Sequence, residues 1–245
     1  MQQAVWTRDV RRFVLEKLQI SKNARILEVG CGTGAITNSL KPPGPAKLYG
    51  LDIHFTSLLL AKDIDKKTIF MCGDGLALPF LSQTFNLTLC HYYLIWVKDN
   101  IQAVKEMARI TRSGGYVAAF AEPDYSARED LPYEMKELGK MQNRALTLQG
   151  VDIHTSKKIR GLFQKAGLQD IHVHQIRRNQ QAQNTSETDW EMEWQVLHFD
   201  LQELAKRKII TEQKIERYHQ IDMQSRKEGN RQLYIPTYYG WGRVK

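Results

Sequence analysis

The stretch Ile26-Leu-Glu28-Val-Gly30-Cys-Gly32-Thr-Gly34 decides the fold of this 245-residue chain. The apolar run over residues 25–29 predicts a short strand that leads directly into a glycine loop. Glycine lets the backbone turn tightly and lets a ligand approach the main chain, because it has no Cβ. The helix expected to follow, over residues 35–40, would present free N–H groups at its start. A nucleotide-like ligand is therefore the expected occupant of this loop.

The glycine spacing alone leaves other interpretations open. The pattern Gly30-x-Gly32-x-x-Ala35 also satisfies the dinucleotide fingerprint, so the spacing does not exclude NAD. A tight turn that binds nothing is the purely structural alternative. The residues around the loop have to decide between these readings.

Strand and helix signals alternate on both sides of the loop. A helix is expected over residues 1–20, with Val10, Phe13, Val14 and Leu18 on one face and Arg and Lys residues opposite. Further helices are expected over residues 56–62 and from Asp99 or Asn100 to Gly114-Gly115. The expected strands are residues 25–29, 47–51, 68–72, 85–90, 116–121, 168–176 and 233–244. Such alternation predicts a parallel sheet with helices on both faces, close to the doubly wound type.

The second half of the chain is mostly helical in pattern. Helices are expected over residues 131–148, from Thr155 and from Thr211. Between the last two, residues 190–204 carry one apolar stripe at helical spacing, and the N-terminal helix and the 131–148 helix are its expected partners. The polar residues 179–186 predict a linker or loop. A long helical excursion therefore interrupts the strands near the end of the chain.

Composition and charge limit the protein class. Apolar residues make up 42% and charged residues 25% of the chain, which is typical of a globular protein. No apolar run reaches the length of a membrane helix, and the start lacks the apolar core of a signal peptide, so we expect a cytoplasmic protein. Three widely spaced cysteines predict neither a disulfide scaffold nor a zinc site. The net charge of +8 keeps nucleic acid open as a partner, although the basic residues are scattered.

Two carboxylates follow the next strands along the chain. Asp52 ends the second expected strand, where it could accept hydrogen bonds from both hydroxyls of a ribose. Asp74 lies in Gly73-Asp74-Gly75 after the third strand, where it could accept from the exocyclic amine of adenine. Because the carboxyl ends of parallel strands lie at one edge of the sheet, these side chains should face the glycine loop.

With Glu28 before the loop and Gly34 completing E-x-G-x-G-x-G, the chain resembles a class I S-adenosylmethionine-dependent methyltransferase over about residues 20–125. It is most similar to the small-molecule type that includes the ubiquinone/menaquinone and sterol methyltransferases. The resemblance implies an α/β fold: a doubly wound, Rossmann-like, mostly parallel seven-stranded sheet whose last strand is antiparallel, with helical cap insertions. It implies one methyltransferase domain over residues 1–245, with an N-terminal helix (1–20), a cofactor-binding core (21–121) and a substrate cover (122–154 and 179–232).

The resemblance also implies which residues bind S-adenosylmethionine and its product S-adenosylhomocysteine. Glu28 would orient the glycine loop and the amino group of the methionine part. Asp52 would bind the ribose, Ile53 or Leu51 would pack on the adenine, and Asp74 would bind the adenine amine. The remaining implied contacts come from Gly30, Cys31, Gly32, Gly75, Leu76 and Cys90.

The acceptor side is less specified. His91 is the candidate general base, because an imidazole titrates near neutrality, and the alternative is a residue that only lines the pocket. Tyr92, Glu122 and Tyr125 are the candidate substrate-binding residues. The sequence Cys90-His91-Tyr92-Tyr93 departs from the Asn/Asp-Pro-Pro-aromatic motif of amino and nucleobase methyltransferases. It also has no acidic residue there to bind magnesium, so no metal is expected.

Four alternatives to these assignments remain. An RNA methyltransferase would suit the net charge, and a non-catalytic cofactor-binding or scaffold subunit would suit the fold, but a small-molecule acceptor is favoured. Trp190 and Trp194 could hold a cationic acceptor by cation–π contact, although a packing role is favoured. His172 and His174 share one face of a strand, and a surface position is favoured over a metal site.

Overall fold

The structure is a computed structural model that describes residues 7–40, 42, 44–176 and 186–245. The linker expected over residues 179–186 lies outside the described residues except for Ser186. The chain divides into two compact units. The first comprises residues 1–122, 155–176 and 237–245, and the second comprises residues 123–154 and 177–236.

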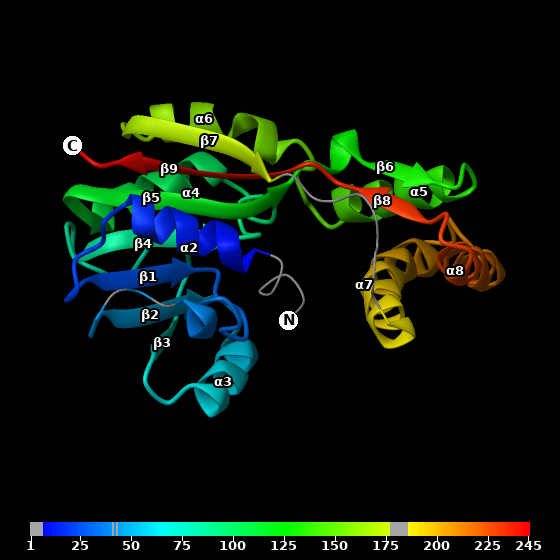
Figure 1. Ribbon diagram of the computed structural model, residues 1–245, viewed down its shortest axis with the longest axis horizontal. Helices are drawn as coiled ribbons and strands as arrows, with labels where there is room; N and C mark the ends of the chain where they lie inside the picture. Colours follow the sequence, from blue (N-terminus) through cyan, green and yellow to red (C-terminus); the bar gives the residue numbers. More distant parts are fainter. Residues whose placement is uncertain (1–6, 41, 43, 177–185) are drawn as a thin grey trace. The chain divides into compact units, whose positions relative to one another are not determined.

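The first unit is built on a seven-stranded sheet (Figure 1). Its strand order is β3-β2-β1-β4-β5-β9-β7. The strands are β1 (Arg25–Val29), β2 (Lys47–Asp52), β3 (Ile69–Cys72), β4 (Phe85–His91), β5 (Thr111–Pro123), β7 (Gln169–Ile176) and β9 (Thr237–Arg243). Strands β3, β2, β1, β4 and β5 pair in parallel, whereas β9 is antiparallel to β7. The doubly wound, mostly parallel sheet with an antiparallel last strand is thereby confirmed.

Helices cover both faces of this sheet. Successive apolar residues of a strand point to opposite faces, and each face needs helices to bury them. Ile26 and Leu87 point to the core on the α2 side, whereas Leu27 and Val117 point to the core on the α4 and α6 side. In Figure 1, α2 lies across one face of the sheet. The helices of this unit are α2 (Arg8–Lys17), α3 (Phe55–Ile64), α4 (Asn100–Ile110) and α6 (Thr155–Lys165), with a 3-10 turn η1 (Thr37–Ser39).

Two expected helices are shorter than the sequence pattern predicts. The one expected over residues 35–40 is only the 3-10 turn η1, since the positive φ of Gly34 (74°) and the prolines after Lys41 leave too few residues between them. The one expected to reach Gly114-Gly115 ends at Ile110, because Thr111 is already extended and pairs with Phe85. The two glycines therefore lie within β5.

The second unit packs three helices beside a small antiparallel sheet. Its strands are β6 (Glu129–Leu131) and β8 (Gln232–Tyr234), its helices are α5 (Met135–Leu148), α7 (Glu187–Lys206) and α8 (Glu212–Lys227), and η2 (Tyr125–Ala127) precedes β6. The expected helix over 131–148 therefore starts later, since Leu131 belongs to β6. The α7 stripe buries Trp194, Leu201 and Leu204 against α5 and α8. Of the two expected partners, α5 is confirmed, whereas α2 buries Val14 in the core of the first unit.

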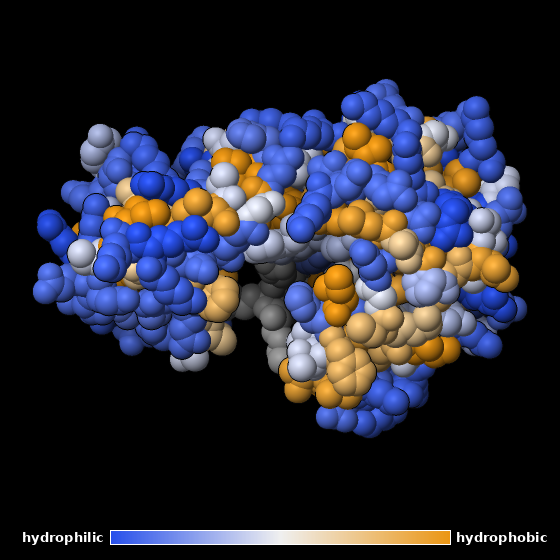
Figure 2. All heavy atoms as spheres, turned by 180° about the vertical axis from the view of Figure 1, so that it is seen from behind, coloured by the Kyte–Doolittle hydropathy of each residue, from blue (hydrophilic) through white to orange (hydrophobic). Residues whose placement is uncertain are grey.

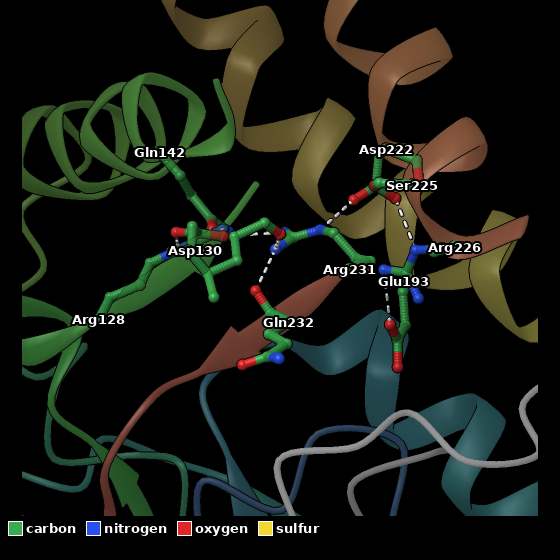
Figure 3. Close-up of polar contacts among 10 residues, drawn as sticks. Arg128, Asp130, Gln142, Glu193, Asp222, Ser225, Arg226, Arg231 and Gln232 are labelled. Atoms are coloured by element: carbon green, nitrogen blue, oxygen red, sulfur yellow. Dashed lines mark hydrogen bonds and ion pairs between the residues drawn. The ribbon is translucent and has the colours of Figure 1, made fainter. Parts of the chain in front are cut away.

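A buried ionic cluster joins the elements of the second unit (Figure 3). The Arg231 guanidinium donates to Asp130 Oδ1 at 2.8 Å and to Asp222 Oδ1 at 2.6 Å. Arg128 also pairs with Asp130, and Arg226 also pairs with Asp222. The side chains of Arg231, Asp130 and Asp222 are only 2–3% exposed. Each buried charge therefore has an opposite charge in contact, which a buried charge requires.

Candidate functional site

The glycine loop after β1 has the conformation that its sequence predicts. Gly30, Gly32 and Gly34 have φ values of 73°, 50° and 74°, in the left-handed region that disfavours other residues. The N–H groups of Gly30 and Cys31 donate to the Leu51 carbonyl at 2.8 and 3.0 Å, which fixes the loop to β2. At Gly32 a Cβ would meet no atom of the described residues within 4 Å, which leaves space for a ligand beside the main chain.

Asp52 lies at the end of β2, directly beside this loop. Its carboxylate accepts hydrogen bonds from the N–H of Gly32 at 2.7 Å and from the N–H of His54 at 2.8 Å. The residue is 8% exposed. The parallel pairing of β1 with β2 produces this approach, since Val29 is opposite Leu51 in the register. The structure thus brings Asp52 and the glycine loop together as the sequence predicts.

Asp74, the carboxylate predicted after β3, is exposed and lies in the turn that follows this strand. Asp74 Oδ1 accepts a hydrogen bond from the Leu76 N–H at 2.8 Å, and the Asp74 carbonyl accepts from Ala77. Asp52 pairs with Cys72 in the register of β2 and β3. Asp74 therefore follows β3 at the same edge of the sheet as Asp52. Gly75 is buried in this turn and Leu76 is half-buried.

An exposed apolar surface adjoins Asp52. Ile53 is 62% exposed, whereas Leu51 is 1% exposed, so only Ile53 is available to pack on a ligand. Apolar side chains also reach the surface along α3, and they are visible in the space-filling view (Figure 2). Phe55, Leu59 and Leu60 are among them. The expected choice between Leu51 and Ile53 is thereby reduced to Ile53.

Glu28 lies at the end of β1 and is 1% exposed. The Thr37 hydroxyl donates a hydrogen bond to Glu28 Oε2. Burial raises the pKa of Glu28 to about 8, although the hydrogen bond from Thr37 and the charge of Arg11 both act to lower it. Burial and the nearby carboxylates also raise the pKa of the Cys31 thiol, which keeps that thiol neutral.

Arg11 is a site residue that the sequence pattern places wrongly. We expected the basic residues of the N-terminal helix to face solvent, but Arg11 is 2% exposed. Its guanidinium donates to the hydroxyls of Thr7 and Ser39, the latter at 2.8 Å. Its charge also acts on Glu28. The buried guanidinium is thus held by two hydroxyls, as a buried charge requires hydrogen-bond partners.

His91 ends β4 and lies next to this arginine. Its Nε2 is 3.2 Å from the Thr7 hydroxyl oxygen. Burial, with the charge of Arg11 as a second cause, lowers the pKa of His91 to about 3. The imidazole is therefore neutral throughout the physiological pH range. Tyr92, which follows it, has a positive φ of 53° and donates its N–H to the Phe120 carbonyl at 3.0 Å.

Glu122 lies near the end of β5 and is fully buried. Its Oε1 accepts hydrogen bonds from the N–H groups of Tyr93 and Leu94, at 3.0 and 3.2 Å. The thiol of Cys90 lies 3.9 Å from the same oxygen. Its Oε2 has no hydrogen-bond partner within the described part of the chain. Burial raises the pKa of Glu122 to about 7, and the pKa of the Cys90 thiol is raised as well.

Tyr93 is a further site residue that the sequence did not single out. Its ring lies where a Cβ at Gly30 would have to be placed. Its hydroxyl lies in the same way against Gly75. Tyr93 therefore connects the glycine loop after β1 with the turn after β3. The only sequence signal was an aromatic residue shortly after β4.

Tyr125 is not among the residues that the first unit brings together. It belongs to the second unit, where it is 7% exposed. Its carbonyl accepts a hydrogen bond from Asn143 Nδ2 at 2.8 Å. Its role in acceptor binding therefore stays a prediction.

The alternative binding sites weighed from the sequence have structural explanations. His172 and His174 are exposed on β7 and stack on Trp241 with ring-centroid distances of 5.0 and 5.4 Å. Trp194 is buried and stacks on His219 at 4.7 Å. Among the residues that the structure describes, no group of His, Cys, Asp and Glu could hold a metal ion. In the same residues we find no helix with the length and apolar character needed to cross a membrane.

Comparison with known proteins agrees with this geometry. A family model described as a methyltransferase domain matches residues 27–119, which include the glycine loop, Asp52, Asp74 and His91. Demethylmenaquinone methyltransferase from Renibacterium salmoninarum is 28% identical over 158 residues, covering 63% of this chain and 66% of that protein. The enzyme of the same name from Corynebacterium urealyticum is 30% identical over 117 residues, covering 48% of each chain. This chain thus spans about half to two thirds of the length of these relatives.

The fold has solved counterparts too. Phosphoethanolamine N-methyltransferase 2 from Haemonchus contortus, in complex with S-adenosylhomocysteine, superimposes with a TM-score of 0.56 at 14% identity. The match covers 96% of this chain and 52% of that one. At this identity the likeness shows the fold alone. Residues 27–119 are therefore similar in sequence to a methyltransferase domain, and the fold is that of solved methyltransferases.

Proposed function

We propose that this protein transfers a methyl group from S-adenosylmethionine to a small-molecule acceptor. The observation that carries the proposal is the fixed arrangement at the end of β1 and β2. There, Asp52 accepts from Gly32 at 2.7 Å, beside a left-handed glycine loop whose main chain is open. These donors and acceptors suit a ligand that has both a ribose and an amino acid part.

Each part of the cofactor has a candidate partner in the first unit. We assign the ribose hydroxyls to Asp52, the adenine amine to Asp74, and the apolar adenine face to Ile53. The backbone of Gly75 and Leu76 would assist at the adenine. Glu28 would face the amino group of the methionine part. Main-chain groups at Gly30, Cys31 and Gly32 would line the methionine part and the ribose. Cys90 would lie beside the methyl group.

The chain itself has little chemistry to perform in such a reaction. The cofactor, when bound, supplies a methyl group that is already activated on a sulfonium. The contribution of the protein is to hold the acceptor atom in line with that group and to keep water away. The rigid ends of β1, β2 and β4 suit such a positioning role.

A base is needed only if the acceptor must lose a proton, and two residues are candidates. His91 remains the sequence-based candidate, but a pKa of about 3 makes its imidazole a weak base. Glu122, with a pKa of about 7 and a buried free Oε2, matches a neutral operating pH better. We therefore propose that His91 lines the site and that Glu122 and Tyr92 face the acceptor. His91→Asn should then keep kcat within about tenfold of the wild type, whereas loss of a true base costs about 10²–10⁴.

The acceptor class follows from the relatives and from the second unit. Because two relatives are demethylmenaquinone methyltransferases, quinone-like rings are the first acceptors to test. In the second unit, α7 exposes Met192, Val196 and Phe199 on the helix face away from its core. We propose that this unit, as the helical insertion of the chain, covers the acceptor and excludes water. An apolar surface of this kind suits an apolar acceptor.

Methyl transfer to an unknown acceptor can be followed with labelled cofactor. The protein is incubated with a lysate of its source cells and S-adenosylmethionine that carries a ¹³C-methyl group. We expect the label in a small, organic-soluble product, and we expect the Asp52→Ala variant to form less of it at a limiting concentration of cofactor. Label recovered in RNA would contradict the small-molecule assignment. No labelled product in any fraction, despite cofactor binding, would contradict catalysis itself and favour a binding subunit.

A further inference from the structure

Tyr93 occupies an unusual position between the two loops of the cofactor site. A Cβ built at Gly30 would lie well under 3.0 Å from the Tyr93 ring, a separation that real Cβ atoms do not show. A Cβ built at Gly75 would likewise lie well under 3.0 Å from the Tyr93 hydroxyl oxygen. The side chain thus spans from the glycine loop after β1 to the turn that carries Asp74. Both glycines are needed because the tyrosine fills the space beside them.

A backbone hydrogen bond holds Tyr93 in this position, and its surroundings keep its hydroxyl protonated. Its N–H donates to the buried Glu122 Oε1 at 3.0 Å, which holds the start of the loop after β4. Burial raises the pKa of the Tyr93 phenol, and the neighbouring acidic groups Cys90, Asp74, Asp52 and Glu122 raise it further. The hydroxyl is therefore neutral, a hydrogen-bond donor, and within electrostatic range of both carboxylates assigned to the cofactor.

From this geometry we propose that Tyr93 is a specificity-determining residue that sets the size of the adenosyl end of the cofactor site. The inference rests on the proposed function, because it takes Asp52 and Asp74 as the ribose and adenine partners. A ligand that extends from Gly30 to Asp74 has to share its walls with the Tyr93 ring. The ring therefore limits how large a group the adenine can carry beside Asp74.

Removal of the ring should enlarge the site in a predictable way. Tyr93→Ala deletes as many heavy atoms beyond Cβ as a benzyl group contains. A benzyl group on the adenine amine is the matching addition, because the secondary amine still has one N–H to donate to Asp74. The Tyr93→Ala variant should therefore bind N6-benzyl-S-adenosylhomocysteine, whereas the wild type should exclude it.

The test measures binding by calorimetry, with S-adenosylhomocysteine and N6-benzyl-S-adenosylhomocysteine as the probes. We expect the wild type to bind the benzyl analogue at least tenfold more weakly than S-adenosylhomocysteine. Tyr93→Ala should reverse this preference. Tyr116→Ala is the matched control, since it truncates a half-buried tyrosine of β5, and it should keep the wild-type preference. Equal preference in wild type and Tyr93→Ala would overturn the proposal.

Two further measurements separate the possible failures. Tyr93→Val is measured in parallel, because its branched side chain keeps part of the apolar contact if the alanine variant does not fold. It should show the same reversal to a smaller degree, and an unchanged preference would again count against Tyr93. If the wild type binds no S-adenosylhomocysteine at all, the proposed function is wrong. If it binds and the preference does not move, only the role of Tyr93 is wrong.

Discussion

The hydroxyl oxygen of Tyr93 lies against Gly75, at the place where a side chain on residue 75 would begin. Gly75 has no positive φ, so its backbone could accept alanine without strain. Its requirement for glycine is therefore steric and depends on Tyr93. At Gly30 both constraints apply, because its φ is 73° and the Tyr93 ring blocks the same space. One aromatic side chain after β4 thus explains part of the glycine pattern in two other loops.

The pair Gly75 and Tyr93 makes a double-mutant cycle informative. Gly75→Ala alone should displace the tyrosine and destabilise the first unit. In the Tyr93→Phe background the nearest remaining atoms, the ring Cζ and Val29 Cγ1, are both 3.1 Å from the new Cβ, so the alanine needs only a small shift of these neighbours. We expect a coupling free energy of about 1–3 kcal/mol, measured by thermal unfolding of the four proteins. Additive effects within about 0.5 kcal/mol would contradict the contact.

Cofactor binding should depend on pH through Glu28. Its pKa in the folded protein is about 8, above the ordinary 4.5, so the carboxyl is mostly protonated at pH 7. A bound cationic amino group favours the ionised form, so binding below pH 8 must release a proton. The affinity for S-adenosylhomocysteine should then rise by up to about tenfold per pH unit from pH 6 to 8 and level off above.

Calorimetry in buffers of different ionisation enthalpy measures both the affinity and the released proton. Glu28→Gln should bind more weakly and without this pH dependence. The control is Glu16→Gln, an exposed glutamate of α2 that should leave the profile unchanged. An affinity for the wild type that is constant between pH 6 and 8 would show that Glu28 does not face the bound amino group.

The stability of the first unit should also respond to pH, through Glu122. Its folded-state pKa of about 7 lies above the ordinary 4.5, so the folded state holds this proton more tightly than the unfolded state does. The resulting stabilisation is complete below about pH 4.5 and is lost as the pH rises through 7. The shift corresponds to about 3 kcal/mol. Calorimetric unfolding from pH 5 to 8 should therefore show a steeper loss of stability in the wild type than in Glu122→Gln. Parallel pH profiles of the two proteins would refute this role.

Arg231 should be essential to the second unit. Its side chain is 3% exposed and contacts both Asp130 and Asp222, so Arg231→Met leaves two buried carboxylates without this partner. Removing one member of a buried ionic cluster typically costs about 3–5 kcal/mol. Urea unfolding followed by far-ultraviolet circular dichroism measures this loss in the variant against the wild type. Lys140→Met, which removes an exposed ion pair with Glu137, should have no measurable effect. Similar stability of the two variants would contradict the importance of the cluster.

The sequence is most informative where a pattern is local. The apolar run before Gly30 and the carboxylates at the end of β2 and after β3 predict the candidate cofactor loops, because strand ends and glycine loops are encoded by neighbouring residues. The positions of Glu28, Asp52 and Asp74 were predictable for this reason.

The missed features depend on contacts between distant segments. Arg11 looks like an ordinary exposed charge on α2, and its partners Thr7 and Ser39 are apparent only once α2 packs against η1. Tyr93 reaches Gly30 and Gly75 only once β1, β3 and β4 are placed side by side. The division into two units likewise follows from packing, since residues 123–154 and 177–236 are far apart in the sequence yet share one core.

The most direct test of the account is the binding of S-adenosylhomocysteine to the wild type, Asp52→Ala and Asp52→Asn by calorimetry. We predict micromolar-scale binding to the wild type and a loss of about 1.5–3 kcal/mol in Asp52→Ala, because hydrogen bonds between a charged group and the ribose are removed. Asp52→Asn keeps an acceptor for the Gly32 N–H and should lie between the two. NAD should not bind. Tight NAD binding, or an unchanged affinity for S-adenosylhomocysteine in Asp52→Ala, would contradict the assignment of this loop to S-adenosylmethionine.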